Sequence, residues 1–363
     1  MSNKLRTGYT TGTHATAVLV AALNELVNGK EENSIEVTLP DDKTATIKVK
    51  RAAKLRYETI KSDNDDIDVT KGAKISLQLL HTPPKDLKPQ TPSKLQIGTT
   101  TLFLYAGEGV GVVTKKGLKI APNYPAINPT PLSMMQKNSM SLLQDKNLQL
   151  YAVISVENGE EIAKQTANAK VGVVGGISIL GTKGIVKPVS ATAYLESIET
   201  EISVAAEENP DLIIFTLGNT AYDYAKKHFH ESSIIEVGNF VYDALALLKP
   251  YPFKKLIFIT ASAKMTKVAQ GFKNTHNRYG SIDFKKIKYA LNIKVGIDLK
   301  DEEFLTLKAV LETLNKKQKK LFVEFITQEA ALQLQKWVMA LKLPLHQIET
   351  ITLPYDINKE LFW

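Results

Sequence analysis

Apolar residues recur at helical spacing near the start of the chain. Five of them fall on one face of a helix, which predicts an amphipathic helix over residues 15–27. Asn28 and Gly29 follow it, and these residue types commonly end helices. The apolar positions are Val18, Leu19, Ala22, Leu23 and Leu26.

A different pattern follows, in which apolar and polar residues alternate. Residues 34–50 show two such runs separated by "PDDK", which predicts a β-hairpin. Further short strands are expected at about 74–80 and 100–105, and the proline-rich stretch 81–94 between them reads as a surface loop. The first half of the chain is therefore expected to be an α+β domain.

In the second half, continuous apolar runs alternate with helical patterns. The runs cover 211–218, 233–240 and 254–261, and the helices are expected at about 219–229, 239–248 and 264–272. This βαβ order predicts a buried, mostly parallel sheet with helices on both faces. Later apolar patterns predict two more helices, near residues 304–314 and 321–342.

Together these patterns predict two domains. Residues 1–184 are expected to form an N-terminal α+β domain, and residues 185–363 a C-terminal three-layer α/β (Rossmann-like) domain with a mostly parallel sheet. Ligands of such sheets bind at the carboxyl ends of the strands. Gly218 and Asn219 follow one strand there and are candidates for cofactor contact, and a similar turn occurs at residues 238–240.

Composition narrows the classes of function. The 363 residues include no cysteine, which excludes disulfides, thiolate nucleophiles and cysteine-held zinc or iron–sulfur sites. No apolar run approaches the roughly 20 residues of a membrane span. The N-terminal residues show no apolar signal segment, so a cytoplasmic protein without membrane association is expected. A homo-oligomer remains open, with Trp337 and Trp363 as possible interface residues.

The chain carries a net charge of +8, which favours an anionic partner. The lysines are scattered, with one dense run, and no basic and aromatic residues interleave as they do where bases stack. A small polyanion is therefore favoured over nucleic acid, and the run is expected to be a solvated helix end. It consists of Lys316, Lys317, Lys319 and Lys320.

The stretch "GYTTGTHATA" (8–17) leads into the first helix. Its threonines and glycines predict a turn whose N–H groups and hydroxyls can hold an anion or a cofactor, with helix capping as the alternative. His14 is expected to be a packing or capping residue. The candidate binding residues are Thr10, Thr11, Gly12 and Thr13.

A glycine-rich segment covers residues 171–190, and it matches neither the dinucleotide fingerprint nor the P-loop. Glycines allow backbone to approach a ligand closely. A strand with bulges is the alternative interpretation. The candidate binding residues are Gly175, Gly176, Ser178, Gly181 and Thr182.

Two polar loops stand out as well. "KSDNDDIDVT" (61–70) holds Asp63, Asp65, Asp66 and Asp68, but it lacks the register of a calcium loop, so an acidic turn is favoured and no protein-bound metal is expected. "GFKNTHNRYG" (271–280) follows a helix with two lysines and offers a base and a cation for carboxylates. Its residues of interest are Asn274, Thr275, His276, Asn277 and Arg278, and the two helix lysines are Lys264 and Lys267.

In this order the segments resemble one family. "RTGYTTGT", "DDIDVT", "GEGVGVVTKKGL…PAINPTP", "GGISILGTKGIVKP" and "GFKNTHNR" are similar to motifs of the cobalt-precorrin-5B methyltransferase family, CbiD, from about Leu5 to Asp283. The resemblance implies methyl transfer from S-adenosylmethionine to ring carbon 1 of cobalt-precorrin-5B, giving cobalt-precorrin-6A in anaerobic cobalamin biosynthesis. A divergent or non-catalytic corrinoid-binding relative is the alternative.

The resemblance also frames the expected site. The Thr10–Thr13 turn, the Gly175–Thr182 segment and the Asn274–His276 turn are expected to line a cleft between the domains, with His276 as candidate base. The chain departs from the family pattern at "TASAK" (260–264), where a "G-H-x-G-K" turn is expected and only the lysine is kept. It also has His14 where the family often has cysteine.

Overall fold

The computed structural model describes residues 6–62, 64–65, 68–186, 191–299 and 303–353. Tertiary contacts group the chain into two compact units, Met1–Ala191 and Thr192–Trp363. The predicted domain division between residues 184 and 185 stays a prediction. None of the described helices is long and apolar enough to cross a membrane.

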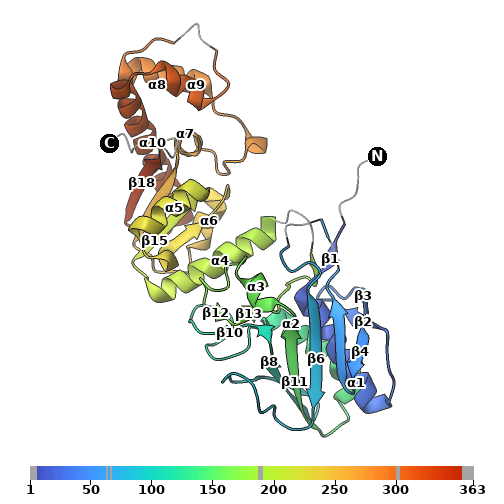
Figure 1. Cartoon of the computed structure of the whole chain (residues 1–363). Helices are drawn as coiled ribbons and strands as arrows, with labels where there is room; N and C mark the ends of the chain where they lie inside the picture. The colour runs from blue at the N-terminus through green and yellow to red at the C-terminus, as the bar shows by residue number, and fades with distance from the viewer. Residues whose placement is uncertain (1–5, 63, 66–67, 187–190, 300–302, 354–363) are drawn as a thin grey trace. The chain divides into compact units, whose positions relative to one another are not determined.

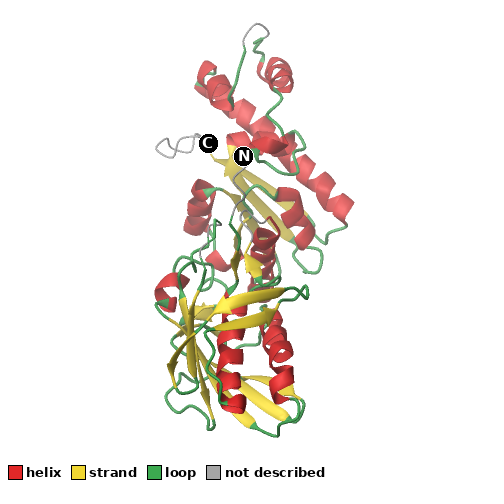
Figure 2. Cartoon of the chain, turned by 90° about the vertical axis from the view of Figure 1, so that its right-hand side faces the viewer, coloured by secondary structure: helices red, strands yellow, loops and turns green. Residues whose placement is uncertain are grey.

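The first unit combines two long helices with several small sheets and one large one (Figures 1 and 2). Its helices are α1 (Thr11–Asn28), α2 (Pro129–Leu143) and α3 (Gly159–Ala163). Its strands are β1 (Gly8–Tyr9), β2 (Ser34–Thr38), β3 (Thr44–Lys48), β4 (Lys50–Ala53), β5 (Arg56–Ile60), β6 (Lys74–Leu80), β7 (Ser93–Ile97), β8 (Thr100–Ala106), β9 (Gly109–Val110), β10 (Val112–Val113), β11 (Gln149–Val156), β12 (Val173–Val174), β13 (Gly176–Ile177) and β14 (Ile185–Val186).

Among the described residues of this unit, six strands form the large sheet in the order β4-β5-β6-β11-β8-β7. Its strands are antiparallel except for the β11–β8 pair, which is parallel. The β2–β3 hairpin confirms the alternating pattern at 34–50. The buried face of α1 and the inward residues of the strands share one hydrophobic core, which therefore holds the first turn of α1 in a fixed place.

The second unit is built on a parallel sheet. Its helices are α4 (Ala191–Glu208), α5 (Asn219–His228), α6 (Val241–Leu247), α7 (Ser262–Ala269), α8 (Phe284–Val295), α9 (Leu307–Thr313) and α10 (Lys316–Leu341), with 3₁₀ turns at Glu231–Ser233 and Asn277–Tyr279. Its strands are β15 (Leu212–Leu217), β16 (Ile234–Glu236), β17 (Lys255–Ala261) and β18 (Gln347–Leu353).

The described strands of this sheet pair in the order β16-β15-β17-β18, all parallel. One face packs against α5 through Ala221 and Ala225. The other face packs against α4, α6, α7 and α10, whose buried residues share a core with Phe215 and Phe258. The predicted parallel strands with helices on both faces are therefore present. β18 lies beside α10 and follows a long helical excursion from β17 (Figure 1).

Candidate functional site

The threonine-rich stretch caps α1 and forms its first turn. Thr10 is the N-cap, and its Oγ1 accepts a hydrogen bond from the Thr13 N–H at 3.3 Å. The prediction of a separate turn before the helix is therefore wrong for residues 11–13. The reason is that the cap satisfies a backbone donor, so the helix begins earlier than its apolar pattern indicates.

The same turn is hydrogen-bonded to the glycine-rich segment. The Gly12 N–H donates to the Leu180 carbonyl at 3.0 Å, and Thr11 Oγ1 accepts from the Leu180 N–H at 2.9 Å. Thr13 Oγ1 donates to the Gly184 carbonyl at 2.7 Å. The structure thus brings two predicted binding segments together, and the Thr11 and Thr13 hydroxyls are engaged with protein groups.

Glycines in this segment allow close backbone packing. Gly176 lies on β13, which pairs with β9, and a Cβ at this position would lie 2.1 Å from backbone atoms of Gly109. Gly181 has φ +139°, and a Cβ there would meet Thr10 Oγ1 at 2.2 Å. Gly175 also has positive φ, Ser178 is half-buried and Thr182 is exposed. The segment is not one bulged strand, because β12, β13 and β14 pair in three different small sheets, and Gly181 lies between strands.

The acidic loop binds its own chain. Asp65 pairs with the Arg6 guanidinium through bonds of 3.0 and 2.9 Å, and Asp68 accepts from Lys61 and from the Thr70 hydroxyl. Asp63 and Asp66 lie outside the described residues. Within the described part, no three metal-binding side chains come together. The two described carboxylates are committed to protein partners, as the acidic-turn interpretation predicts.

His14 is buried beside this loop, with 3% of its surface exposed. Its Nδ1 lies 3.0 Å from Thr59 Oγ1, whose own proton goes to the Lys48 carbonyl, so Nδ1 is the donor. Burial, and secondarily the charge of Lys61, lowers the His14 pKa to about 4. The imidazole is neutral at physiological pH and has a packing role.

Three predicted site residues of the second unit lie together at the carboxyl edge of its sheet. Gly218, with φ +89°, follows β15 and precedes α5, which begins at Asn219. Lys264 reaches from α7 so that its Nζ lies 3.9 Å from where a Gly218 Cβ would be. Burial lowers the Lys264 pKa; Glu236 opposes this shift and Lys267 adds to it.

A buried lysine holds the 271–280 loop at the same edge. Lys267 Nζ donates to the Thr275 carbonyl, Asn277 Oδ1 and the Gly280 carbonyl at 2.8–3.0 Å. Thr275 in turn bonds Asn239, which follows β16, through its hydroxyl and its N–H. Burial lowers the Lys267 pKa. The sequence indicates Lys267 only as a lysine of the preceding helix, and its role in holding the loop was not predicted.

His276 is exposed within this loop. Its ring Nδ1 accepts a hydrogen bond from the backbone N–H of Arg278 at 3.1 Å. The backbone N–H of His276 donates to Asn274 Oδ1 at 3.0 Å. Because Nδ1 caps a 3₁₀ turn, proton transfer would have to use the other ring nitrogen. The role of His276 as base stays a prediction, as does a cleft lined by residues of both units.

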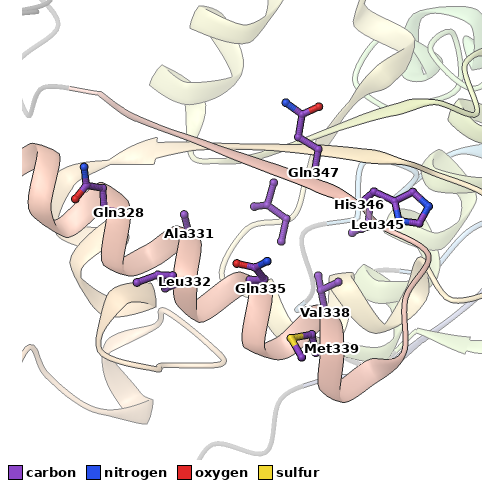
Figure 3. Close-up of a pocket in the computed structure, with 10 residues that line it drawn as sticks. Gln328, Ala331, Leu332, Gln335, Val338, Met339, Leu345, His346 and Gln347 are labelled. Carbon is purple, nitrogen blue, oxygen red and sulfur yellow. The ribbon is translucent and has the colours of Figure 1, made fainter.

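A pocket of about 630 Å³ lies elsewhere in the second unit (Figure 3). Leu332, Gln335 and Met339 line it from one face of α10, and His346 and Gln347 line it from the segment entering β18. It is at the amino end of β18, whereas Gly218 and Lys264 are at the carboxyl ends of their strands. None of the predicted site residues lines it.

The CbiD family model matches residues 1–188, which is 188 of the 363 residues. A relative from Picrophilus torridus is 36% identical over 80% of this chain and 83% of its own length. The chain belongs to the CbiD family. That relative is named cobalt-precorrin-5B C(1)-methyltransferase, as is a Priestia megaterium protein that is 38% identical over 77% of this chain and 75% of its own. A crystal structure of the Archaeoglobus fulgidus cobalamin biosynthesis protein CbiD is 29% identical, covers 73% of this chain and 79% of its own, and has a TM-score of 0.40.

Within this CbiD chain, the "TASAK" segment forms the end of β17 and the start of α7. Ser262 is buried there, and sequence reasoning named it only as part of a departure from the family pattern. Glu236, at the end of β16, was also missed. The available signal for Glu236 was a charged residue inside the apolar run 233–240. No sequence signal marks the burial of Ser262.

Proposed function

We propose that this chain is an S-adenosylmethionine-dependent methyltransferase that acts on ring carbon 1 of cobalt-precorrin-5B and gives cobalt-precorrin-6A in anaerobic cobalamin biosynthesis. The observation that carries the proposal is the similarity to proteins of that name, which are 35–38% identical over 75–87% of this chain. The reaction takes place in the cytoplasm, on a small molecule rather than on nucleic acid.

S-adenosylmethionine supplies an electrophilic methyl group on a sulfonium sulfur. Carbon 1 of the macrocycle forms the new bond as the carbon–sulfur bond breaks, and S-adenosylhomocysteine leaves. Such an in-line displacement depends mainly on alignment of the two reactants. The protein therefore needs two binding sites in register more than it needs strong acids or bases, with His276 as the candidate acceptor if a proton is lost.

The candidate binding residues form two groups, and we assign one group to each reactant. Gly218, Asn219 and Lys264 lie where open parallel sheets bind their ligands, and we assign the co-substrate to them. The tetrapyrrole carries several carboxylates, which a chain of net charge +8 attracts. Asn274 and Thr275, and the Thr10–Thr13 and Gly175–Thr182 segments, remain candidates for contact with it.

The direct test mixes the purified protein with cobalt-precorrin-5B and S-adenosylmethionine without oxygen. Mass spectrometry should show one added methyl group, and the gain should require both the protein and the co-substrate. A His276→Ala protein should lose activity by about tenfold or more if His276 is the base. Full activity of that variant would remove the assignment of His276 and leave the transfer itself intact.

A corrinoid-binding relative without activity is the second candidate. The "TASAK" segment favours it, because the chain keeps only the lysine of the expected family turn there. Binding of tetrapyrrole without any gain of methyl in the assay above would support this candidate and reject the transferase. A possible homo-oligomer is a separate proposal, and size-exclusion chromatography with light scattering tests it.

A further inference from the structure

The strand order of the second sheet reverses between two neighbouring strands, and such a point is where open α/β sheets form a binding crevice. β15 and β17 are hydrogen-bonded to each other, yet the helices that follow them leave to opposite faces. α5 packs on the face with Ile214 and Ile257, and α7 packs on the face with Phe215 and Phe258. A ligand group can enter a sheet edge at such a point of divergence, because neither helix covers the gap.

Both helices begin at this edge without a side-chain cap. The residues before them are Gly218 for α5 and Ala261 for α7, and no side chain accepts a hydrogen bond from their first turns. By contrast, Thr10 caps α1 and Asn315 caps α10. The first-turn N–H groups of α5 and α7 therefore present two positive helix ends to one crevice, which is an environment that favours an anion.

Lys264 places a full charge at the same point. It belongs to α7, and its Nζ lies over Gly218, which precedes α5. Within the described residues the ammonium has no hydrogen bond and no ion pair, although the side chain is half-buried. Glu236 favours the charged form of Lys264 without forming an ion pair with it, so a ligand that supplies an opposite charge would stabilise the half-buried cation further. Gly218 has no side chain to block that ligand.

An independent observation comes from Ser262, the first residue of α7. It is 2% exposed, and its Oγ has no hydrogen-bond partner in the structure. Buried hydroxyls are nearly always hydrogen-bonded in native proteins, so an orphaned one needs an explanation. Ser262 lies where β17 runs into α7, at the carboxyl edge of the sheet, and a bound group that reaches this position would complete its bonding.

We infer that the crevice formed by Ser262, Lys264 and the Gly218–Asn219 turn binds a carboxylate group. This inference rests on the proposed function, which offers two sources of carboxylate: the amino-acid end of S-adenosylmethionine and the side chains of the tetrapyrrole. The crevice favours the first. Glu236 lies close enough to influence Lys264, and a neighbouring carboxylate suits the ammonium group that only the amino-acid end carries.

Isothermal titration calorimetry with three stable probes separates the possibilities. S-adenosylhomocysteine carries the amino-acid carboxylate, methylthioadenosine keeps the nucleoside without it, and cobyrinic acid carries corrinoid side-chain carboxylates. Lys264→Met should weaken S-adenosylhomocysteine binding by about tenfold or more and leave methylthioadenosine binding unchanged. Lys264→Arg should retain most of the affinity. Ser262→Ala should weaken the same probe without lowering the thermal stability of the free protein, because it removes an unbonded hydroxyl.

Lys336→Met is the matched control, since Lys336 is exposed near the carboxyl end of α10, where the chain turns into the amino end of β18. Weakened cobyrinic acid binding alone in Lys264→Met would support the carboxylate site and assign it to the tetrapyrrole. Unchanged affinity for both carboxylate probes, or equal losses for S-adenosylhomocysteine and methylthioadenosine, would overturn the inference. If the unaltered protein binds none of the probes, the proposed function fails with it.

Discussion

At the scale of single residues, His14 couples stability to pH. Its pKa is lowered from 6.5 to about 4 in the folded chain, so the unfolded chain binds more protons between these values. The stability that neutral His14 provides is therefore complete above pH 6.5 and is lost as the pH falls toward 4. We expect the free energy of unfolding to drop by about 2 kcal/mol between pH 8 and pH 5 from this group alone.

Urea unfolding at the two pH values measures this effect. The matched variant is His14→Gln, which does not titrate but can still bond to Thr59. Subtracting its pH dependence from that of the unaltered chain should leave the contribution of His14, since the other histidines are common to both. An equal pH dependence in the two proteins would show that the imidazole is not kept neutral by burial.

Gly176 is a second residue whose substitution should change the stability of the fold by a predictable amount. A Cβ there would lie 2.1 Å from Gly109 backbone atoms, which cannot move without breaking the β9–β13 pair. We expect Gly176→Ala to lower the free energy of unfolding by about 3 kcal/mol. In Gly29→Ala the new methyl group meets nothing within 4 Å and only the positive φ is strained, which should cost about 1 kcal/mol. Chemical denaturation compares them, and similar losses would contradict the packing argument.

At the scale of elements, Lys267 organises the 271–280 loop. Replacing it with methionine removes three hydrogen bonds to that loop. We expect amide hydrogen exchange in residues 273–280 of Lys267→Met to rise by about tenfold or more, with little change in β15 and β17. Lys285→Met serves as the control, because Lys285 is exposed on α8. Unchanged exchange in the loop would mean that its bonds to Asn239 and Tyr242 are enough to hold it.

Much of the order of helices and strands could be predicted from the sequence. The spacing of apolar residues and the presence of turn-forming residues are properties of short stretches of chain. The predicted helix at 219–229 is α5, and the one at 321–342 is α10, which begins at Lys316 because Asn315 and Gln318 form a capping box. The lysine run forms the first turn of α10. The prediction omitted β11, although it is central in the large sheet. It also omitted β18, which joins the sheet only after a long helical segment.

The candidate site could also be predicted from the sequence only in part. The βαβ order was enough to place Gly218, Asn219 and Lys264 at one edge, since consecutive parallel strands end on the same side. No local pattern could show that Thr11 bonds to Leu180, because that contact joins residues 169 positions apart. Nor could it show that the hydroxyls proposed to hold a ligand are engaged with protein groups. Such contacts depend on how distant segments pack.

At the scale of the whole molecule, each compact unit has cores of its own. The hydrophobic core that contains α1 and β6 is made only of residues of the first unit. The cores on the two faces of the β15–β17 sheet are made only of residues of the second. We expect a fragment of residues 192–363 to unfold cooperatively when expressed alone, as a test of the predicted two domains. Thermal unfolding followed by near-ultraviolet circular dichroism measures this. A fragment without a cooperative transition would show that the second unit depends on the first.

The bonding of α1 to the glycine-rich segment has a consequence for synthesis. β1 pairs with β14, and Gly12 bonds to Leu180, so the beginning of the chain waits for partners that are translated last within the first unit. At about 5–20 residues per second, the 169 positions from Thr11 to Leu180 take roughly 10–30 s to be synthesised. During that interval the first turn of α1 lacks its bonds to Leu180 and Gly184, although β2, β5 and β6, which cover the helix, have already been made. A nascent chain paused before residue 180 therefore holds α1 by its packing alone, without the hydrogen bonds that fix its first turn.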